Sequence, residues 1–184
     1  MVNVIERINM DANHTRPPRD VDIERLSGGS WRLRAQQTVS MPPAEVFPFF
    51  SAADNLARLT PPELGFNILT PTPILMRAGA VIDYRIRLWG LPLRWRTLIS
   101  AWRPPVEFMD EQVKGPYAQW IHRHRFTPTP NGGTLIEDEV QFRLPLGPLG
   151  AIAAPLVRRQ LRWIFGYRRR AIAESFSGRG RRTG

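Results

Sequence analysis

The stretch AQWIHRHRFTPTPNGGTLIEDEVQFRL, residues 118–144, decides the fold because it alternates in two segments on either side of one turn. Successive side chains of a strand point to opposite faces, so every second residue shares a face. In the first segment, 118–127, one face carries Trp120, His122, His124 and Phe126. In the second, 134–144, it carries Ile136, Asp138, Val140, Phe142 and Leu144. Asn131-Gly132-Gly133 between them is typical of a hairpin turn, so the stretch predicts two antiparallel strands.

Further strand patterns precede this hairpin. Glycine- and proline-rich turns separate segments predicted as strands over 32–40, 65–70, 80–89, 93–103 and 107–114. Short connections between consecutive strands indicate an antiparallel meander, which twists strongly and needs cover on one face. With the hairpin, these segments predict a curved seven-stranded antiparallel sheet.

Helical patterns supply that cover. Pro43 suits the first turn of a short helix, and Asp54 suits the N-cap of a second one. From Leu149 to Phe176 the apolar residues recur at helical spacing, which predicts one long helix with Arg158, Arg159, Arg162 and Arg169 outside. The face predicted to point inward carries Ile152, Leu156, Ile164, Tyr167 and Ala171. A helix of roughly 22 residues is about 33 Å long, enough to cross the sheet. The fold class expected is therefore α+β.

Length and composition fit one domain of 184 residues with two tails. Residues 1–30 are polar and unpatterned and predict a flexible arm, residues 31–177 form the domain, and the basic residues 178–184 predict a disordered tail. The absence of cysteine excludes disulfides, iron–sulfur clusters and Cys-based zinc sites. The net charge of +10 favours weak association with anionic surfaces.

No secretory signal or membrane span is expected from the sequence. The first fifteen residues lack an apolar core, and the longest uncharged stretch, 144–157, is shorter than the roughly twenty residues that a span requires. The location predicted by default is the cytoplasm. Nothing in the sequence predicts an oligomeric state.

Polar residues interrupt the inward faces of the predicted sheet. Asp110 and Asp138 accompany His122 and His124 there, and a buried carboxylate without a donor costs several kcal/mol. Two interpretations stay open: a satisfied internal network, or a wet cavity whose polar groups orient a ligand. The residues predicted to bind the ligand are Tyr84, Trp95, Thr97, Asp110, Gln112, Trp120, His122, His124, Asp138 and Tyr167.

Several strings of this sequence resemble the SRPBCC group of bacterial ligand-binding domains. They are residues 59–76 (LTPPELGFNILTPTPILM), 82–85 (IDYR), 92–96 (PLRWR), 102–126 (WRPPVEFMDEQVKGPYAQWIHRHRF), 132–134 (GGT), 144–150 (LPLGPLG) and 158–169 (RRQLRWIFGYRR). The resemblance implies the helix-grip fold of START domains, Bet v 1 proteins and polyketide cyclases. It implies a hydrophobic cavity beneath the long helix, without fixing the ligand or any reaction.

The function predicted on these grounds is binding or transport of a hydrophobic or aromatic small molecule, such as a lipid, without a cofactor or metal. One alternative is a lyase or isomerase of the cyclase or dehydratase type, with His122, His124 and Asp138 as candidate catalytic residues. Another is an adaptor domain that binds an acidic partner through its arginines. A two-histidine, one-carboxylate metal site is conceivable but not predicted, nor is specific nucleic-acid binding.

Overall fold

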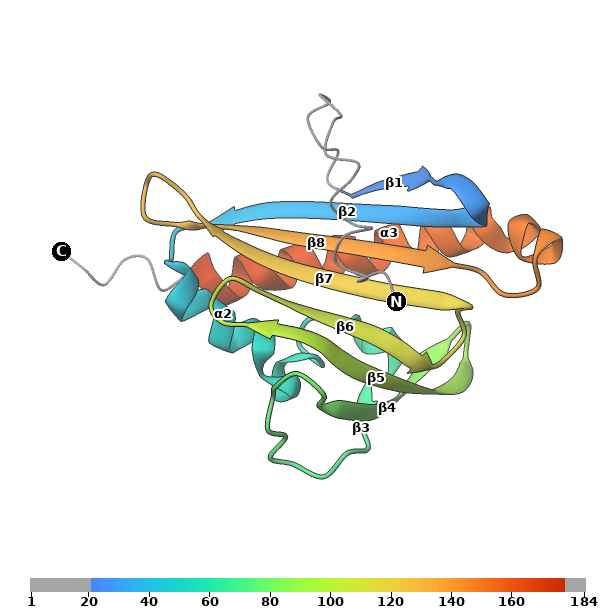
Figure 1. The fold of residues 1–184 in the computed structure, drawn as a ribbon, viewed down its shortest axis with the longest axis horizontal. Coiled ribbons are helices and arrows are strands. Elements are labelled where there is room, and N and C mark those ends of the chain that lie inside the picture. The colour runs from blue at the N-terminus through green and yellow to red at the C-terminus, as the bar shows by residue number, and fades with distance from the viewer. Residues whose placement is uncertain (1–20, 178–184) are drawn as a thin grey trace.

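Eight strands form a single antiparallel sheet that curves around one long helix in the computed structural model, which describes residues 21–177 (Figure 1). The strand order is β1-β2-β8-β7-β6-β5-β4-β3. The strands are β1 (Asp22–Arg25), β2 (Ser30–Val39), β3 (Asn67–Ile68), β4 (Val81–Leu88), β5 (Leu91–Arg103), β6 (Glu107–Lys114), β7 (Gln119–Pro128) and β8 (Thr134–Arg143). The helices are α2 (Pro43–Ser51) and α3 (Pro148–Ser177), with 3-10 turns η1 (Ser27–Gly29), η2 (Ala53–Asn55) and η3 (Pro62–Leu64).

The sheet has eight strands where the sequence predicted seven. The additional strand is β1, which pairs with β2 from Asp22↔Arg34 to Arg25↔Trp31. The flexible arm predicted over 1–30 was therefore wrong for residues 22–30, because pairing with a neighbouring strand supplies order that a short polar segment does not show in its sequence. Residues 1–20 of the predicted arm and the predicted tail, residues 178–184, lie outside the described residues.

The central hairpin places on one face the residues that its alternation predicts. Across β7 and β8, Trp120 pairs with Phe142, His124 with Asp138, and Phe126 with Ile136. In an antiparallel pair, residues directly opposite each other point to the same face. Phe126, Ile136, Val140 and Phe142 are all at most 2% exposed, so this face is the inner one.

Helix α3 runs across the inner face of the sheet (Figure 1). Its buried residues recur every three or four positions: Ala154, Val157, Leu161, Phe165, Arg168, Ile172 and Phe176. The inner face predicted from the sequence was wrong for Ile152 and Leu156, which are 77% and 54% exposed. The apolar stripe that contains them is offset from the buried stripe, and Arg168 interrupts the apolar pattern of the buried one.

Helix α2 closes one end of the space between sheet and α3. Pro43 takes the first position of α2, as predicted, whereas Asp54 lies inside η2 and does not cap it. We call this part of the layer the filled end, defined by Phe47, Phe50, Phe108, Phe126 and Phe176. The five rings are each at most 5% exposed. Several of them meet edge to face, for instance Phe47 and Phe126 with centroids 5.4 Å apart.

Candidate functional site

A cavity of about 180 Å³ lies next to the filled end, between the sheet and α3. We call this part of the layer the hollow end. Its wall is mostly apolar and comes from the segment after α2, from β4 and β5, and from α3. The apolar residues include Leu56, Leu59, Leu64, Phe66, Met76, Ile82, Ile86, Leu88, Ile99, Leu161, Ile164 and Phe165. A surface of this kind suits an apolar molecule with few polar groups.

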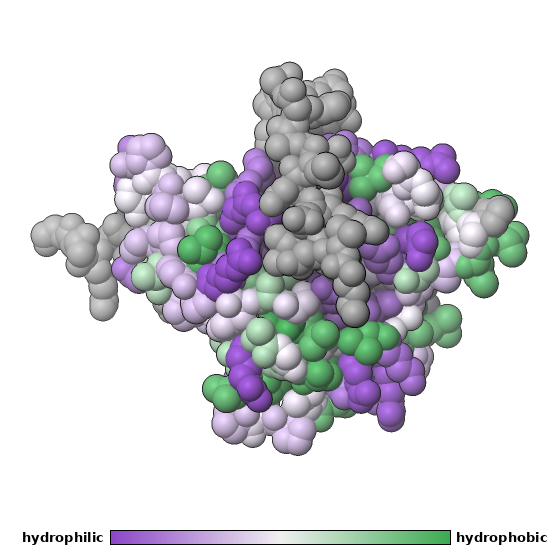
Figure 2. All heavy atoms as spheres, in the orientation of Figure 1, coloured by the Kyte–Doolittle hydropathy of each residue, from purple (hydrophilic) through white to green (hydrophobic). Residues whose placement is uncertain are grey.

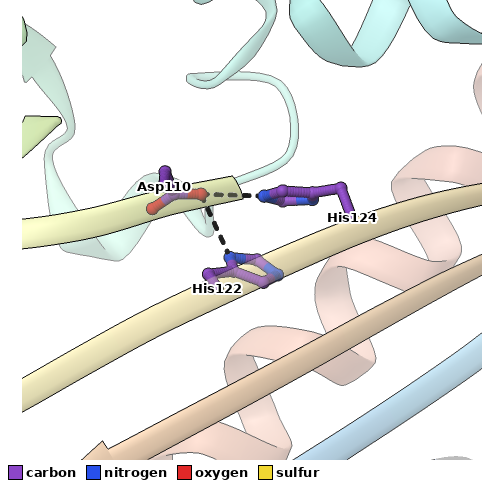
Figure 3. A group of neighbouring side chains, drawn as sticks. All are labelled: Asp110, His122 and His124. Atoms are coloured by element: carbon purple, nitrogen blue, oxygen red, sulfur yellow. Dashed lines mark hydrogen bonds and ion pairs between the residues drawn. The ribbon is translucent and has the colours of Figure 1, made fainter. Parts of the chain in front are cut away.

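One side of the cavity is polar, with Asp110, His122, His124 and Arg168 in its wall and Asp138 behind them. We call these five residues the histidine–aspartate cluster. His124 Nε2 lies 2.8 Å from Asp110 Oδ2, and His122 Nδ1 lies 3.6 Å from the same oxygen (Figure 3). Behind the rings, Asp138 Oδ1 lies 2.9 Å from His124 Nδ1 and 3.1 Å from His122 Nε2. Each imidazole thus lies between two carboxylates.

Strand register assembles most of this cluster. Asp110 in β6 pairs with His122 in β7, and His124 pairs with Asp138 in β8. Side chains of directly opposite residues lie within contact distance on the same face. The two imidazoles, two residues apart on β7, have ring centroids 3.7 Å apart. Three adjacent strands therefore place four polar side chains at one point of the inner face.

Arg168 reaches the cluster from α3. Its Nε donates to Asp138 Oδ2 at 2.8 Å and its Nη2 donates to Asp138 Oδ1 at 3.1 Å, which is the paired geometry preferred by a guanidinium and a carboxylate. Nη2 also lies 3.3 Å from His124 Nδ1. His124 Nδ1 lies closer to Asp138 Oδ1, at 2.9 Å. The proton on Nδ1 therefore faces the carboxylate and not the guanidinium.

The pKa values of the two aspartates lie below their ordinary range. Burial opposes the charged form of Asp138, but the Arg168 charge and hydrogen bonds from both histidines outweigh it and hold the pKa well below its usual value. Burial likewise opposes the charged form of Asp110, and the hydrogen bond from His124 together with nearby positive charge lowers the pKa. Both carboxyl groups are therefore ionised at neutral pH.

The two histidines shift in opposite directions. Burial and the neighbouring charge of His124 lower the pKa of His122, so its ring is neutral near pH 7. Burial also disfavours a charge on His124, but hydrogen bonds to Asp110 and Asp138 outweigh it and raise the pKa. With His124 protonated, the charges of His124 and Arg168 balance those of the two aspartates. Such a cluster can hold a proton beside the cavity and exchange it with a ligand.

Asp110, His122 and His124 also offer three ligand atoms within 4.8 Å of one another, close enough for a metal ion. The same atoms already form the hydrogen bonds of the cluster. Metal binding requires a neutral histidine, and the raised pKa of His124 opposes this. That the site works without a metal remains a prediction.

Most residues predicted to bind a ligand do line the cavity: Tyr84, Trp95, Thr97, Asp110, Trp120, His122 and His124. Asp138 lies behind the histidines and acts on the cavity through them. The structure does not bring Gln112 or Tyr167 to it. Gln112 holds the β6–β7 turn by donating to the Tyr117 carbonyl at 2.7 Å, and Tyr167 is half-buried on α3 outside the cavity wall.

Arg168 is the residue of the candidate site that the sequence did not reveal, since the arginines named on this helix, Arg158, Arg159, Arg162 and Arg169, were all expected outside. Arg168 is 7% exposed. Its position held a usable signal: Phe165 lies three residues before it and Ile172 four residues after it, both on the buried face. The cavity wall contributed by Leu56, Leu59 and Leu64 was not predicted either.

No protein-family model matches the chain, and a search of curated proteins finds no match. Solved structures do match. A START superfamily protein from Mycobacterium smegmatis is 12% identical with a TM-score of 0.59, over 79% of this chain and 97% of that one. A protein from Thermus thermophilus is 18% identical with a TM-score of 0.56, over 78% and 99%. The ginseng major latex-like protein 151 of Panax ginseng is 10% identical with a TM-score of 0.54, over 81% and 99%.

Proposed function

Because the chain has the helix-grip fold of START and Bet v 1-like proteins, we propose that it binds or carries a mainly apolar small molecule in the hollow end. The observation that carries this proposal is the cavity itself, which is apolar on most sides and polar on one. Filling this space would remove the apolar wall from water, at roughly 25 cal/mol per Å². The polar side would then orient the ligand.

The free oxygen of Asp110 indicates which polar group the ligand carries. Both contacts of the Asp110 carboxylate within the cluster use Oδ2, and Oδ1 has no hydrogen bond within residues 21–177. The side chain is 18% exposed and lines the cavity. An ionised carboxylate only accepts hydrogen bonds. The ligand that fits best therefore presents a donor, such as an alcohol or a phenol, to Asp110.

Two naphthalene probes test this proposal. 2-Naphthol carries a hydroxyl donor, and 2-methylnaphthalene has a similar shape without one. We expect both to bind, measured by calorimetry, and 2-naphthol to bind about tenfold more tightly, since a hydrogen bond to a charged group contributes about 1.5–3 kcal/mol. Binding of 2-methylnaphthalene should change little with salt, because it involves no charge.

Variants distinguish the cavity from other surfaces. Leu161→Trp fills the cavity and should abolish binding of both probes, whereas Leu75→Trp, at a residue 76% exposed and outside the cavity wall, should leave it unchanged. Asp110→Asn should remove the preference for 2-naphthol. Failure of both probes to bind, together with native mass spectrometry that detects no cargo, would contradict the proposed function.

A second candidate is a reaction of the cyclase or dehydratase type, favoured by the hydrogen bond of His124 to Asp110 on the cavity wall. Both ring nitrogens of His124 contact carboxylates, so a protonated His124 would act as a general acid through Asp110, which lines the cavity. His124→Gln tests it against binding: turnover of a polyketide-like substrate should disappear while the affinity for 2-naphthol persists. Unchanged turnover would exclude this role for His124.

A further inference from the structure

The first half of α3 carries an apolar stripe that no described residue covers. Leu149, Ile152, Leu156 and Trp163 are 65%, 77%, 54% and 40% exposed. They recur every three, four and seven residues, so they share one side of the helix. That side faces away from the sheet, because the buried residues of the same turns, such as Val157 and Leu161, lie on the opposite side. An amphipathic helix normally turns such a stripe inward.

The turn between β4 and β5 adds two more exposed apolar side chains beside this stripe. Trp89 and Leu91 are 57% and 67% exposed. Trp89 and Gly90 form a two-residue turn with φ of 50° and 81°. Asparagine or glycine normally takes the first position, and a bulky residue is strained in this left-handed conformation. Folding gains little from an exposed tryptophan here, so its presence points to a contact outside the chain.

These six residues, Trp89, Leu91, Leu149, Ile152, Leu156 and Trp163, form what we call the end surface. Trp89, Leu156 and Trp163 line one groove, which joins the turn to the helix. Leu64 lines both this groove and the cavity of the hollow end. Apolar side chains gather at the right-hand end of the molecule in Figure 2, where Figure 1 shows the start of α3 and the β4–β5 turn.

Positive charge surrounds the end surface. Arg87 and Arg159 line the groove beside a single acidic residue, Glu63. Arg162 is exposed on α3 next to Trp163. Two copies of the chain joined through this surface would bring like charges together, which disfavours a symmetric dimer. A nucleic acid would engage the arginines but leave six large apolar side chains in water. An anionic lipid bilayer would contact the arginines and would also take the apolar side chains out of water.

We propose that the end surface docks onto an anionic lipid bilayer. The apolar side chains lie at the boundary of headgroups and acyl chains, and the arginines contact the lipid phosphates. Tryptophan is enriched at this depth because its ring is apolar and its N–H is polar. No helix within residues 21–177 is long and apolar enough to cross a membrane. Leu64 then separates the cavity from the bilayer.

Co-sedimentation of the full chain with vesicles tests the proposal. We expect binding to vesicles of phosphatidylcholine with about 30% phosphatidylglycerol, and at least roughly tenfold weaker binding to phosphatidylcholine alone. Ile152→Glu and Trp89→Glu should each weaken binding about tenfold, because each removes the burial of one large apolar side chain. Leu75→Glu is the matched control, since Leu75 is 76% exposed on a different loop, and its binding should equal that of the wild type.

Several outcomes would overturn the docking proposal. One is equal binding to the neutral and anionic vesicles, and another is unchanged binding of Ile152→Glu and Trp89→Glu. A dimer detected by light scattering and abolished by these two variants would instead identify a second copy as the occupant. The variants should keep the wild-type affinity for 2-naphthol and the wild-type denaturation midpoint, so failure of docking and failure of cavity binding can be told apart.

Discussion

The two ends of the layer between sheet and α3 are both mostly apolar, but they are packed differently. At the filled end, the aromatic rings interlock, and Phe126 contacts Phe47 and Phe50 with centroids 5.4 and 5.2 Å apart. At the hollow end, Tyr84 and Trp95 stack on one another along a wall and leave a cavity of about 180 Å³. Protein interiors are normally close-packed. The filled end is therefore the better-packed part of the core, and the open space at the hollow end supports the proposal that a ligand binds there.

Truncating a core side chain should have the largest effect on the free energy of unfolding. Phe126→Ala at the filled end should lower the free energy of unfolding by about 3–5 kcal/mol, because the interlocked rings cannot collapse into the space. Leu64→Ala at the hollow end should cost about 2 kcal/mol, because its surroundings are already partly open. Urea denaturation measures both. Equal losses with unchanged m-values would show that the two ends are packed equally well.

Variants of the histidine–aspartate cluster, which adjoins the filled end through the stacking of His124 on Phe108, should have the next largest effect on stability. Arg168→Met leaves the Asp138 carboxylate buried without its guanidinium, so it should cost about 3 kcal/mol of unfolding free energy. Adding Asp138→Leu removes the buried carboxylate that has lost its guanidinium, and the double variant should be more stable than Arg168→Met alone. Purely additive losses in this double-mutant cycle would mean that the ion pair is not what joins α3 to the sheet.

The smallest effect expected is on the pH dependence of stability. His124 has a raised pKa, so its stabilising contribution is complete below its unfolded pKa of about 6.5 and is lost as pH rises through the folded pKa. His122 has a lowered pKa, so its contribution is present above about pH 6.5 and is lost as pH falls through the folded pKa.

Single variants separate the two histidines. His124→Gln should remove the loss of stability on the alkaline side, and His122→Gln should remove the loss on the acidic side. Denaturant midpoints recorded between about pH 5 and pH 8 measure both slopes. If the two variants change the slope of stability against pH in the same direction, the assignment of the charged ring to His124 is wrong.

Much of the fold could be predicted from the sequence because strand alternation is a local signal. Alternation on both sides of one turn predicts that His124 and Asp138 share the inner face, and the structure pairs them directly. Strand β1 could not be predicted in this way, because four residues, Asp22–Arg25, show no alternation of their own and become ordered by pairing with β2.

The candidate site was predictable where it lies on strands and not where it depends on α3. Asp110 and His122 share an inner face by register alone. Arg168 breaks the apolar pattern of the buried helical face, and the partner that makes its burial favourable, Asp138, lies 30 residues earlier in the chain. The stripe with Ile152 and Leu156 is apolar but exposed. Apolar periodicity alone therefore selected the wrong side of the helix.

The pairing of β2 with β8 has a consequence for how the chain folds. Arg34 and Glu139, which join these strands, are 105 residues apart in sequence. Contacts between such distant residues must overcome a large loss of chain entropy before they contribute, and sheets that depend on them fold slowly, on the order of milliseconds to seconds. During synthesis, the neighbouring strands of the meander are complete before α3 leaves the ribosome. We therefore expect the part of the inner face that carries Asp110 and Asp138 to stay in contact with water until α3 packs against it.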